Sequence, residues 1–233
     1  MKRICLLSTL AMLMAATGCK ENTPRQAAQL SQKEAAIVMV GTCSNDAFLM
    51  LMLGQRNALV STPEEAQQYL DAAQFGKETA GALKKALKDA PATDLALRQK
   101  AWNEMNGKLT EEAKRVSPAW GADCILFGIG LRHVSRAFTL FTSNSSPAEG
   151  VRDMSLKLAR MALASDFAQI MFKSGRKLPL PEKMKKALAA IETADTSTIE
   201  KCRACASQLS RLLKMMKAVA EKGQGALDQF PDE

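Results

Sequence analysis

The sequence predicts an all-α protein, a multi-helix bundle or irregular helical array of about eight to ten helices. Three observations support this fold class. Aromatic residues make up only 5% of the chain, whereas Ala, Leu, Lys, Met and Gln are plentiful. Several helix starts can be read directly from the sequence. No stretch sustains the alternation of apolar and polar residues, rich in β-branched side chains, that a strand requires.

The first two predicted helices are the most apolar. Helical spacing from Ala27 through Leu30 and Val38 towards Gly41 predicts a helix over residues 27–40. The next stretch, DAFLMLMLGQRNALV, predicts a helix over 45–58 that is buried on most sides. Met50 and Met52 within it point about 200 degrees apart, so they are core residues and not a pair of copper ligands.

The starts of several later helices are predicted from capping residues. A capping residue, often a proline at the first helical position, and an acidic residue three places on are typical of a helix start. The pattern occurs at Thr62-Pro63-Glu65, at Ser146-Pro147-Glu149 and at Ser197 with Glu200, and more loosely at Thr110. The remaining predicted helices span residues 63–75, 77–90, 94–106, 110–116, 119–142, 147–173, 182–193 and 198–222.

One domain accounts for these helices. We assign residues 1–18 to a leader, 19–26 to a short tether, 27–222 to the helical domain and 223–233 to a flexible tail. The segment SGRKLPLP, residues 174–181, is the clearest internal loop and a candidate boundary between two lobes. The capping patterns do not recur at a fixed period, so a regular helical repeat is not indicated.

The first residues have the three parts of a secretory signal. Two positive charges in MKR precede an apolar run of about thirteen residues, which is too short to span a membrane, and small residues lead to Cys19. The stretch AATGC resembles the lipobox of bacterial lipoproteins, although Ala16 replaces the usual Leu. An ordinary secretory signal is the alternative. The resemblance implies lipidation of Cys19 and attachment of the mature chain to a membrane.

The same resemblance implies a location. Lys20, not Asp, follows the cysteine, which in the enterobacterial sorting pattern favours the outer membrane over the inner one. A lipoprotein anchor carries more than one acyl chain, so attachment is expected to be stable. We therefore expect a protein of the bacterial cell envelope that faces the periplasm.

Composition narrows the classes of partner. Removing the leader with Lys2 and Arg3 lowers the net charge from +8 to +6. This excess favours anionic lipid or an acidic partner, but together with few aromatics it falls short of the signature of a nucleic-acid-binding protein. Six basic residues form the densest basic stretch and are either a solvated surface or a site for an anionic surface: Lys173, Arg176, Lys177, Lys183, Lys185 and Lys186.

Four cysteines remain after the leader, apart from Cys19. Cys43, Cys124, Cys202 and Cys205 predict two disulfides in an oxidising compartment. In the favoured pairing, Cys43 and Cys124 each bond to one of Cys202 and Cys205, stapling early helices to the last one. In the alternative, Cys43 bonds to Cys124 and Cys202 to Cys205.

The CxxC pair Cys202 and Cys205 has other interpretations. A thiol-disulfide enzyme would need the pair at a helix N-terminus, whereas the cap at Ser197 places Cys202 about one turn inside the helix. A four-cysteine zinc site has the right ligand number but only one CxxC pair. Haem attachment fails because Ala206 stands where CxxCH requires histidine.

No motif predicts catalysis, a metal site or a cofactor. His133 is the only histidine, and Arg132 and Arg136 beside it are expected to disfavour its protonation. We expect a structural role for it, and Gly128 and Gly130 in the same helix to let another helix approach closely. The leading functional hypothesis is a lipid-anchored envelope protein with a non-catalytic binding or scaffolding role and an envelope protein as partner. Two alternatives are a ligand-binding or transport-accessory lipoprotein with an apolar cleft, and a thiol-disulfide protein.

Overall fold

The computed structural model describes residues 29–53, 61–88, 93–143 and 149–231. Over these ranges the chain forms α-helices and a short 3-10 helix, with no strand, which confirms the all-α prediction. The elements are α2 (Gln32–Leu53), α3 (Pro63–Ala72), α4 (Lys77–Lys88), α5 (Leu95–Val116), α6 (Gly121–Ser143), α7 (Glu149–Leu163), α8 (Asp166–Lys177), α9 (Glu182–Glu192), α10 (Ile199–Lys222) and η1 (Gln224–Gln229).

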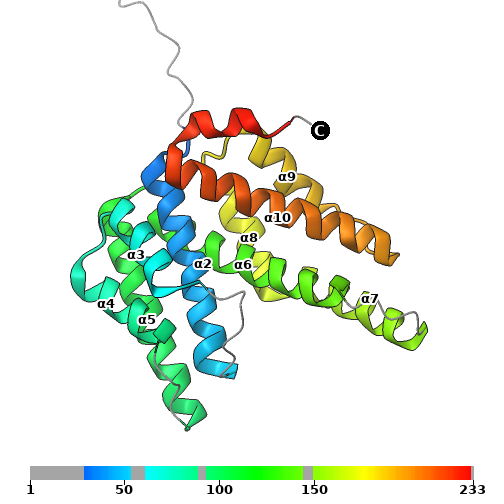
Figure 1. Ribbon diagram of the computed structural model, residues 1–233, viewed down its shortest axis with the longest axis horizontal. Coiled ribbons are helices and arrows are strands. Elements are labelled where there is room, and N and C mark those ends of the chain that lie inside the picture. The colour runs from blue at the N-terminus through cyan, green and yellow to red at the C-terminus, as the bar shows by residue number, and fades with distance from the viewer. Residues whose placement is uncertain (1–28, 54–60, 89–92, 144–148, 232–233) are drawn as a thin grey trace, which may run out of the picture.

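Two helices, α2 and α6, form the centre of the molecule (Figure 1). Every residue of α2 from Glu34 to Ala47 is buried. Ser117, just before α6, donates to Glu34 near the start of α2, and Arg132 in the middle of α6 donates to Asp46 further along α2. The two helices therefore run in the same direction. The other helices therefore share a core built on these two.

The crossing of α2 and α6 depends on two glycines. A Cβ atom on Gly128 would lie 2.0 Å from the carbonyl oxygen of Val38, and one on Gly41 would lie 2.4 Å from that of Ile125. Gly130 brings α6 equally close to α8, since its Cβ would lie 2.5 Å from the oxygen of Phe167. The close approach expected for Gly128 and Gly130 is thus confirmed.

The remaining helices divide into two groups around this pair. In Figure 1, α3, α4 and α5 lie on one side of α2 and α6, and α7 to α10 lie on the other. The first group packs on α2 and α6 through α3, α4 and α5, and the second through α7, α8 and α10. The two groups of helices are therefore connected mainly by their packing on α2 and α6.

Several predicted boundaries were wrong because packing overrode local signals. Residues 27–40 and 45–58 were expected to be separate helices, but α2 runs through Gly41, whose missing side chain serves the helix crossing. The helices predicted over 94–106 and 110–116 are one helix, α5, in which the Thr110 hydroxyl donates to the Asn106 carbonyl (2.8 Å) instead of capping. The helix predicted over 147–173 is two, because Ser165 caps α8.

The capping predictions had mixed outcomes. Thr62 caps α3 and accepts a hydrogen bond from the Glu65 amide, with Pro63 at the first helical position, as predicted. Near the end of the chain the cap is Thr198 and not Ser197, whose amide instead donates to Asp195 Oδ1 at 2.7 Å. The pattern at Ser146 and Pro147 lies outside the described residues.

The predicted loop and tail are more ordered than expected. α8 continues to Lys177, and Leu178 and Leu180 of the short connection that follows are buried. The Leu30 amide donates to the Pro179 carbonyl at 2.8 Å, so the connection is packed against the start of the domain. The segment predicted as a flexible tail contains η1, which buries Leu227 against α10.

Among the described residues, two helices are long and apolar enough to cross a membrane, at Gln32–Leu51 and Gly121–Thr142. Both are mostly buried inside the fold, 83% and 61% of the respective window. These two segments belong to the central helices α2 and α6, and they are long and apolar because they form the centre of the core.

Candidate functional site

A run of polar residues lies in the most buried part of α2. Thr42, Ser44, Asn45 and Asp46 are at most 2% exposed, although the helix around them is apolar. Buried polar groups are costly unless they find hydrogen-bond partners, and Ser44, Asn45 and Asp46 find theirs on other elements. Thr42 is satisfied within the helix, where its hydroxyl donates to the Met39 carbonyl at 2.7 Å.

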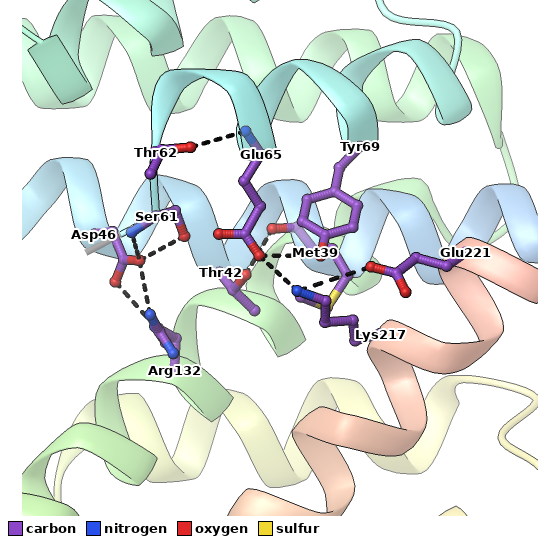
Figure 2. Close-up of polar contacts among 10 residues, drawn as sticks. All are labelled: Met39, Thr42, Asp46, Ser61, Thr62, Glu65, Tyr69, Arg132, Lys217 and Glu221. Carbon is purple, nitrogen blue, oxygen red and sulfur yellow. Dashed lines mark hydrogen bonds and ion pairs between the residues drawn. The ribbon is translucent and has the colours of Figure 1, made fainter. Parts of the chain in front are cut away.

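Asp46 forms a buried ion cluster with two arginines of α6. Arg132 donates to both carboxylate oxygens, from Nε and Nη2, at 3.0 Å each. Arg136 Nη2 lies 2.9 Å from Oδ1, and the amide and hydroxyl of Ser61 donate to Oδ2 at 2.8 and 2.7 Å. Figure 2 shows Asp46 facing Ser61 and Arg132. The cluster holds Ser61, which precedes the cap of α3, and one face of α6 against α2.

A second polar cluster joins α3 to α10. Lys217 of α10 donates to Glu65 Oε1 at 2.9 Å and lies 3.8 Å from Glu221, and the buried hydroxyl of Tyr69 donates to the same Glu65 oxygen at 3.3 Å (Figure 2). Burial, with the Glu65 charge beside it, raises the pKa of Tyr69. Tyr69 is therefore a neutral hydrogen-bond donor to Glu65 within α3, and the Lys217–Glu65 pair is the contact that joins α3 to α10.

Four ring-bearing side chains contact one another in succession near Ser44 and Asn45 of the polar run. We call Phe48, Trp102, His133 and Phe167, from α2, α5, α6 and α8, the aromatic cluster. Phe48 lies 5.1 Å from Trp102 at 62° and 6.2 Å from Phe167 at 50°, and His133 stacks on Phe167 at 3.8 Å and 15°. All four are partly exposed. Half-buried rings from four helices, in a chain with 5% aromatics, form a surface suited to recognition.

Asn45 is fully buried, and its side chain contacts His133 of this cluster. Its amide Nδ2 lies 3.4 Å from His133 Nδ1, so an amide donating there leaves the ring proton on Nε2. Within the described part of the chain, Asn45 Oδ1 has no hydrogen-bond partner. The site therefore contains a buried acceptor next to aromatic surfaces.

Neighbouring polar groups hold the rings in place. Trp102 Nε1 donates to the Ser44 carbonyl at 3.4 Å, and Ser44 Oγ donates to Asn106 Oδ1 at 3.4 Å. Burial lowers the pKa of His133, so the imidazole is neutral at pH 7. The direction agrees with the sequence prediction, but the cause is burial and not the neighbouring arginines.

The four predicted disulfide cysteines are buried and are free thiols in this structure. Cys43 lies within electrostatic range of Lys217, which is twelve residues, or about 18 Å, beyond Cys205 along α10. Cys124 is near Glu34, whereas Cys202 faces the Thr196 carbonyl. The expected disulfides between the early helices and α10 are not formed in this structure, because Cys43 and Cys124 have neighbours other than Cys202 and Cys205.

The thiols also lack the electrostatics of a redox pair. Burial raises the pKa of Cys202, and raises that of Cys205 to about 12. Burial likewise raises the pKa of Cys43 to about 12 and that of Cys124 further still. A redox-active CxxC pair requires a lowered thiol pKa, so the direction opposes the thiol-disulfide alternative.

The basic stretch is partly engaged within the protein. Arg176 pairs with Glu192, and Lys177 lies 3.0 Å from Asp123. Lys183 donates to the carbonyls of Leu227 and Phe230 at 3.4 and 2.8 Å, which positions the segment after α10. The exposed members Lys173, Lys185 and Lys186 leave a smaller basic surface than the sequence suggested.

Sequence reasoning missed most of the candidate site. The polar run from Thr42 to Asp46 interrupts an apolar stretch, and that interruption was a signal for buried polar contacts. Nothing in the sequence linked Phe48, Trp102 and Phe167, since they come from helices far apart along the chain. Among the described residues, no group of three or more His, Cys, Asp and Glu side chains comes together as metal ligands. The predicted lipidation residue Cys19 lies outside the described residues.

Comparisons of the chain with protein-family models, with curated proteins and with solved structures found no significant match.

Proposed function

We propose that this chain is a lipid-anchored protein of the bacterial cell envelope that faces the periplasm. Its proposed role is to bind an envelope protein through the aromatic cluster. The single observation that carries the binding role is that four half-buried rings from four helices contact one another in succession. Rigid aromatic side chains provide large contact areas at small entropic cost, which is why they are enriched where proteins bind partners.

Support for the anchor comes from the sequence around Cys19. The described domain starts about ten residues after this cysteine, so a lipid there would keep the domain close to the membrane surface. Binding of anionic surfaces by the basic stretch is a separate proposal. It now rests mainly on Lys173, Lys185 and Lys186.

Fractionation of cells tests the anchor. Wild-type protein is expected in the outer-membrane fraction with an acylated N-terminal cysteine by mass spectrometry, and Cys19→Ala is expected to lose the acyl mass and appear in the soluble fraction. Cys5→Ser is the matched control, because Cys5 belongs to the predicted leader. An unmodified N-terminus in the native product would contradict the proposal.

Crosslinking in intact cells tests the binding role. A photoreactive amino acid at position 102 is expected to form an adduct that Phe48→Ala weakens. The same amino acid at exposed Lys100, two residues before position 102 and therefore about 200 degrees away around α5, serves as the control. Equal labelling at both positions, or labelling that Phe48→Ala leaves unchanged, would count against the aromatic cluster as the binding site.

A further inference from the structure

We infer that two copies of this chain associate through α7, with α7 of one copy lying antiparallel against α7 of the other. The inference goes beyond the proposed binding role, because it uses none of the rings of the aromatic cluster.

The outward side of α7 carries an apolar stripe. Met154 and Met161 are 64% and 58% exposed, whereas Ala159 and Ala162 belong to the buried side of the helix. Residues seven apart differ by only about 20 degrees around a helix, so the two methionines lie in one line along α7. Leu140, in the last turn of the neighbouring helix α6, is also more than half exposed. Exposed apolar groups of this kind, methionine among them, are typical of surfaces that bind protein.

The charges beside the stripe favour a second copy as the partner. Asp153 and Arg160, both exposed, each precede one of the methionines, so both lie about 100 degrees from the stripe on the same edge of it. In an antiparallel pair related by a twofold axis, this edge of one helix meets the same edge of the other. Asp153 of each copy then faces Arg160 of the other, while Met154 of each copy faces Met161 of the other. The surface of α7 is therefore complementary to itself in both shape and charge.

Two neighbours of this edge are compatible with the arrangement. Arg160 Nε donates to the Thr196 carbonyl at 3.3 Å, and an arginine has further N–H donors for a carboxylate. Lys157 is exposed and lies midway between the two methionines along α7, so the two copies of this residue come close to each other at the axis. Its long side chain can carry the ammonium group out into water.

The position of α7 argues against lipid as the partner. In Figure 1, α7 projects away from the start of α2 and from η1, which lie together at another end of the molecule. Gln224 of η1 donates to the Leu30 carbonyl, so this end includes the first described residues. A membrane held at the start of the domain is therefore not the surface that α7 faces.

The experiment crosslinks the full chain in intact cells with a short bismaleimide. Cys43, Cys124, Cys202 and Cys205 are buried, so a cysteine introduced on the surface is the reactive site, and the unsubstituted chain measures the background from all other thiols. Lys157→Cys is expected to give a dimer of twice the chain mass, joined at position 157 in both copies by peptide mass spectrometry. Lys185→Cys, at an exposed position on α9, is the control and is expected to give no dimer above background.

Substitutions in the Lys157→Cys background test the contact itself. Met161→Glu is expected to lower the yield of dimer about ten-fold, because it places two carboxylates in an apolar contact. Leu97→Glu on α5 is the matched control, since Leu97 is exposed to the same extent, and should leave the yield unchanged. Thermal midpoints of the variants verify that each protein is folded.

Exchange of the charges tests the antiparallel register. Asp153→Lys is expected to lower the yield about three-fold, and addition of Arg160→Glu is expected to restore it, because the pair is re-formed with reversed signs. Failure of the second substitution to restore the yield would overturn this register. The self-association would be overturned by equal yields from Lys157→Cys and Lys185→Cys, by equal effects of Met161→Glu and Leu97→Glu, or by an adduct with a chain of different mass in place of the dimer. None of these results bears on crosslinking at position 102, which tests the aromatic cluster separately.

Discussion

At the scale of single residues, Asp46 has the largest expected effect on stability. It is fully buried, and its carboxylate is shared by Arg132 and Arg136, whose side chains are 24% and 10% exposed. Asp46→Asn keeps the shape but leaves buried guanidinium groups without their carboxylate. We expect the free energy of unfolding to fall by about 3–5 kcal/mol, measured by urea denaturation.

An exposed ion pair provides the control for this prediction. Glu78 lies 2.6 Å from Lys108, with both side chains more than half exposed. Glu78→Gln is expected to change stability little, because water screens such pairs. Similar effects of the two substitutions would show that the Asp46 cluster is not a stabilising contact.

His133 gives the molecule a specific pH dependence. Burial lowers its folded pKa, so near the ordinary histidine value of about 6.5 the unfolded chain binds the proton more readily than the folded protein. The contribution to stability is therefore fully present above about pH 6.5 and is lost as the pH falls towards the folded pKa. Urea midpoints measured from about pH 7.5 to about pH 5.5 should decrease.

The control is His133→Gln, which cannot titrate in this range. Because His133 is the only histidine, the difference in slope between wild type and this variant isolates its contribution from that of carboxylates. Parallel curves for the two proteins would contradict the prediction.

At the scale of elements, the parallel crossing of α2 and α6 depends on glycine. Gly128→Ala would place a Cβ 2.0 Å from the Val38 carbonyl oxygen, and this contact is with backbone that has no alternative rotamer. The helices must separate, so we expect a loss of about 3 kcal/mol or more in thermal or urea unfolding.

Gly107 in α5 is the matched control. A Cβ at this position meets nothing within 4 Å, and alanine favours a helix over glycine by about 1 kcal/mol. Gly107→Ala should therefore stabilise the protein. If Gly128→Ala also stabilised it, the close crossing described above would be incorrect.

The helix ends show how far local sequence determines an element. Thr62 with Pro63 and Glu65 was predicted correctly because a cap and its first turn lie within four residues. Thr110 was not, because its hydroxyl satisfies the Asn106 carbonyl inside α5 and the packed helix continues. A threonine followed by acidic residues suits both positions, and only contacts from other elements distinguish them.

At the scale of the whole molecule, burial of the thiols determines their chemistry. Cys43, Cys124, Cys202 and Cys205 are at most 3% exposed, and burial raises the pKa of each thiol. We expect all four to resist a thiol reagent in the folded protein and to react once it is unfolded. Reductant should leave the thermal midpoint unchanged.

One result would contradict the prediction that the four thiols become reactive on unfolding. Failure of the thiols to react even after unfolding without reductant would mean that they are oxidised, and peptide mapping would then show which pairing exists. A Cys202→Ser variant that reacts at three sites on unfolding serves as the stoichiometric control.

The sequence by itself determined the all-α class, most helix starts and the core role of Met50. These properties follow from local periodicity and capping, which neighbouring residues encode. The tertiary structure decided where helices join or divide, which thiols are neighbours, and that Phe48, Trp102, His133 and Phe167 contact one another in succession. Such contacts depend on the crossing of α2 and α6 at Gly41 and Gly128, and no local pattern specifies how two helices distant in sequence cross.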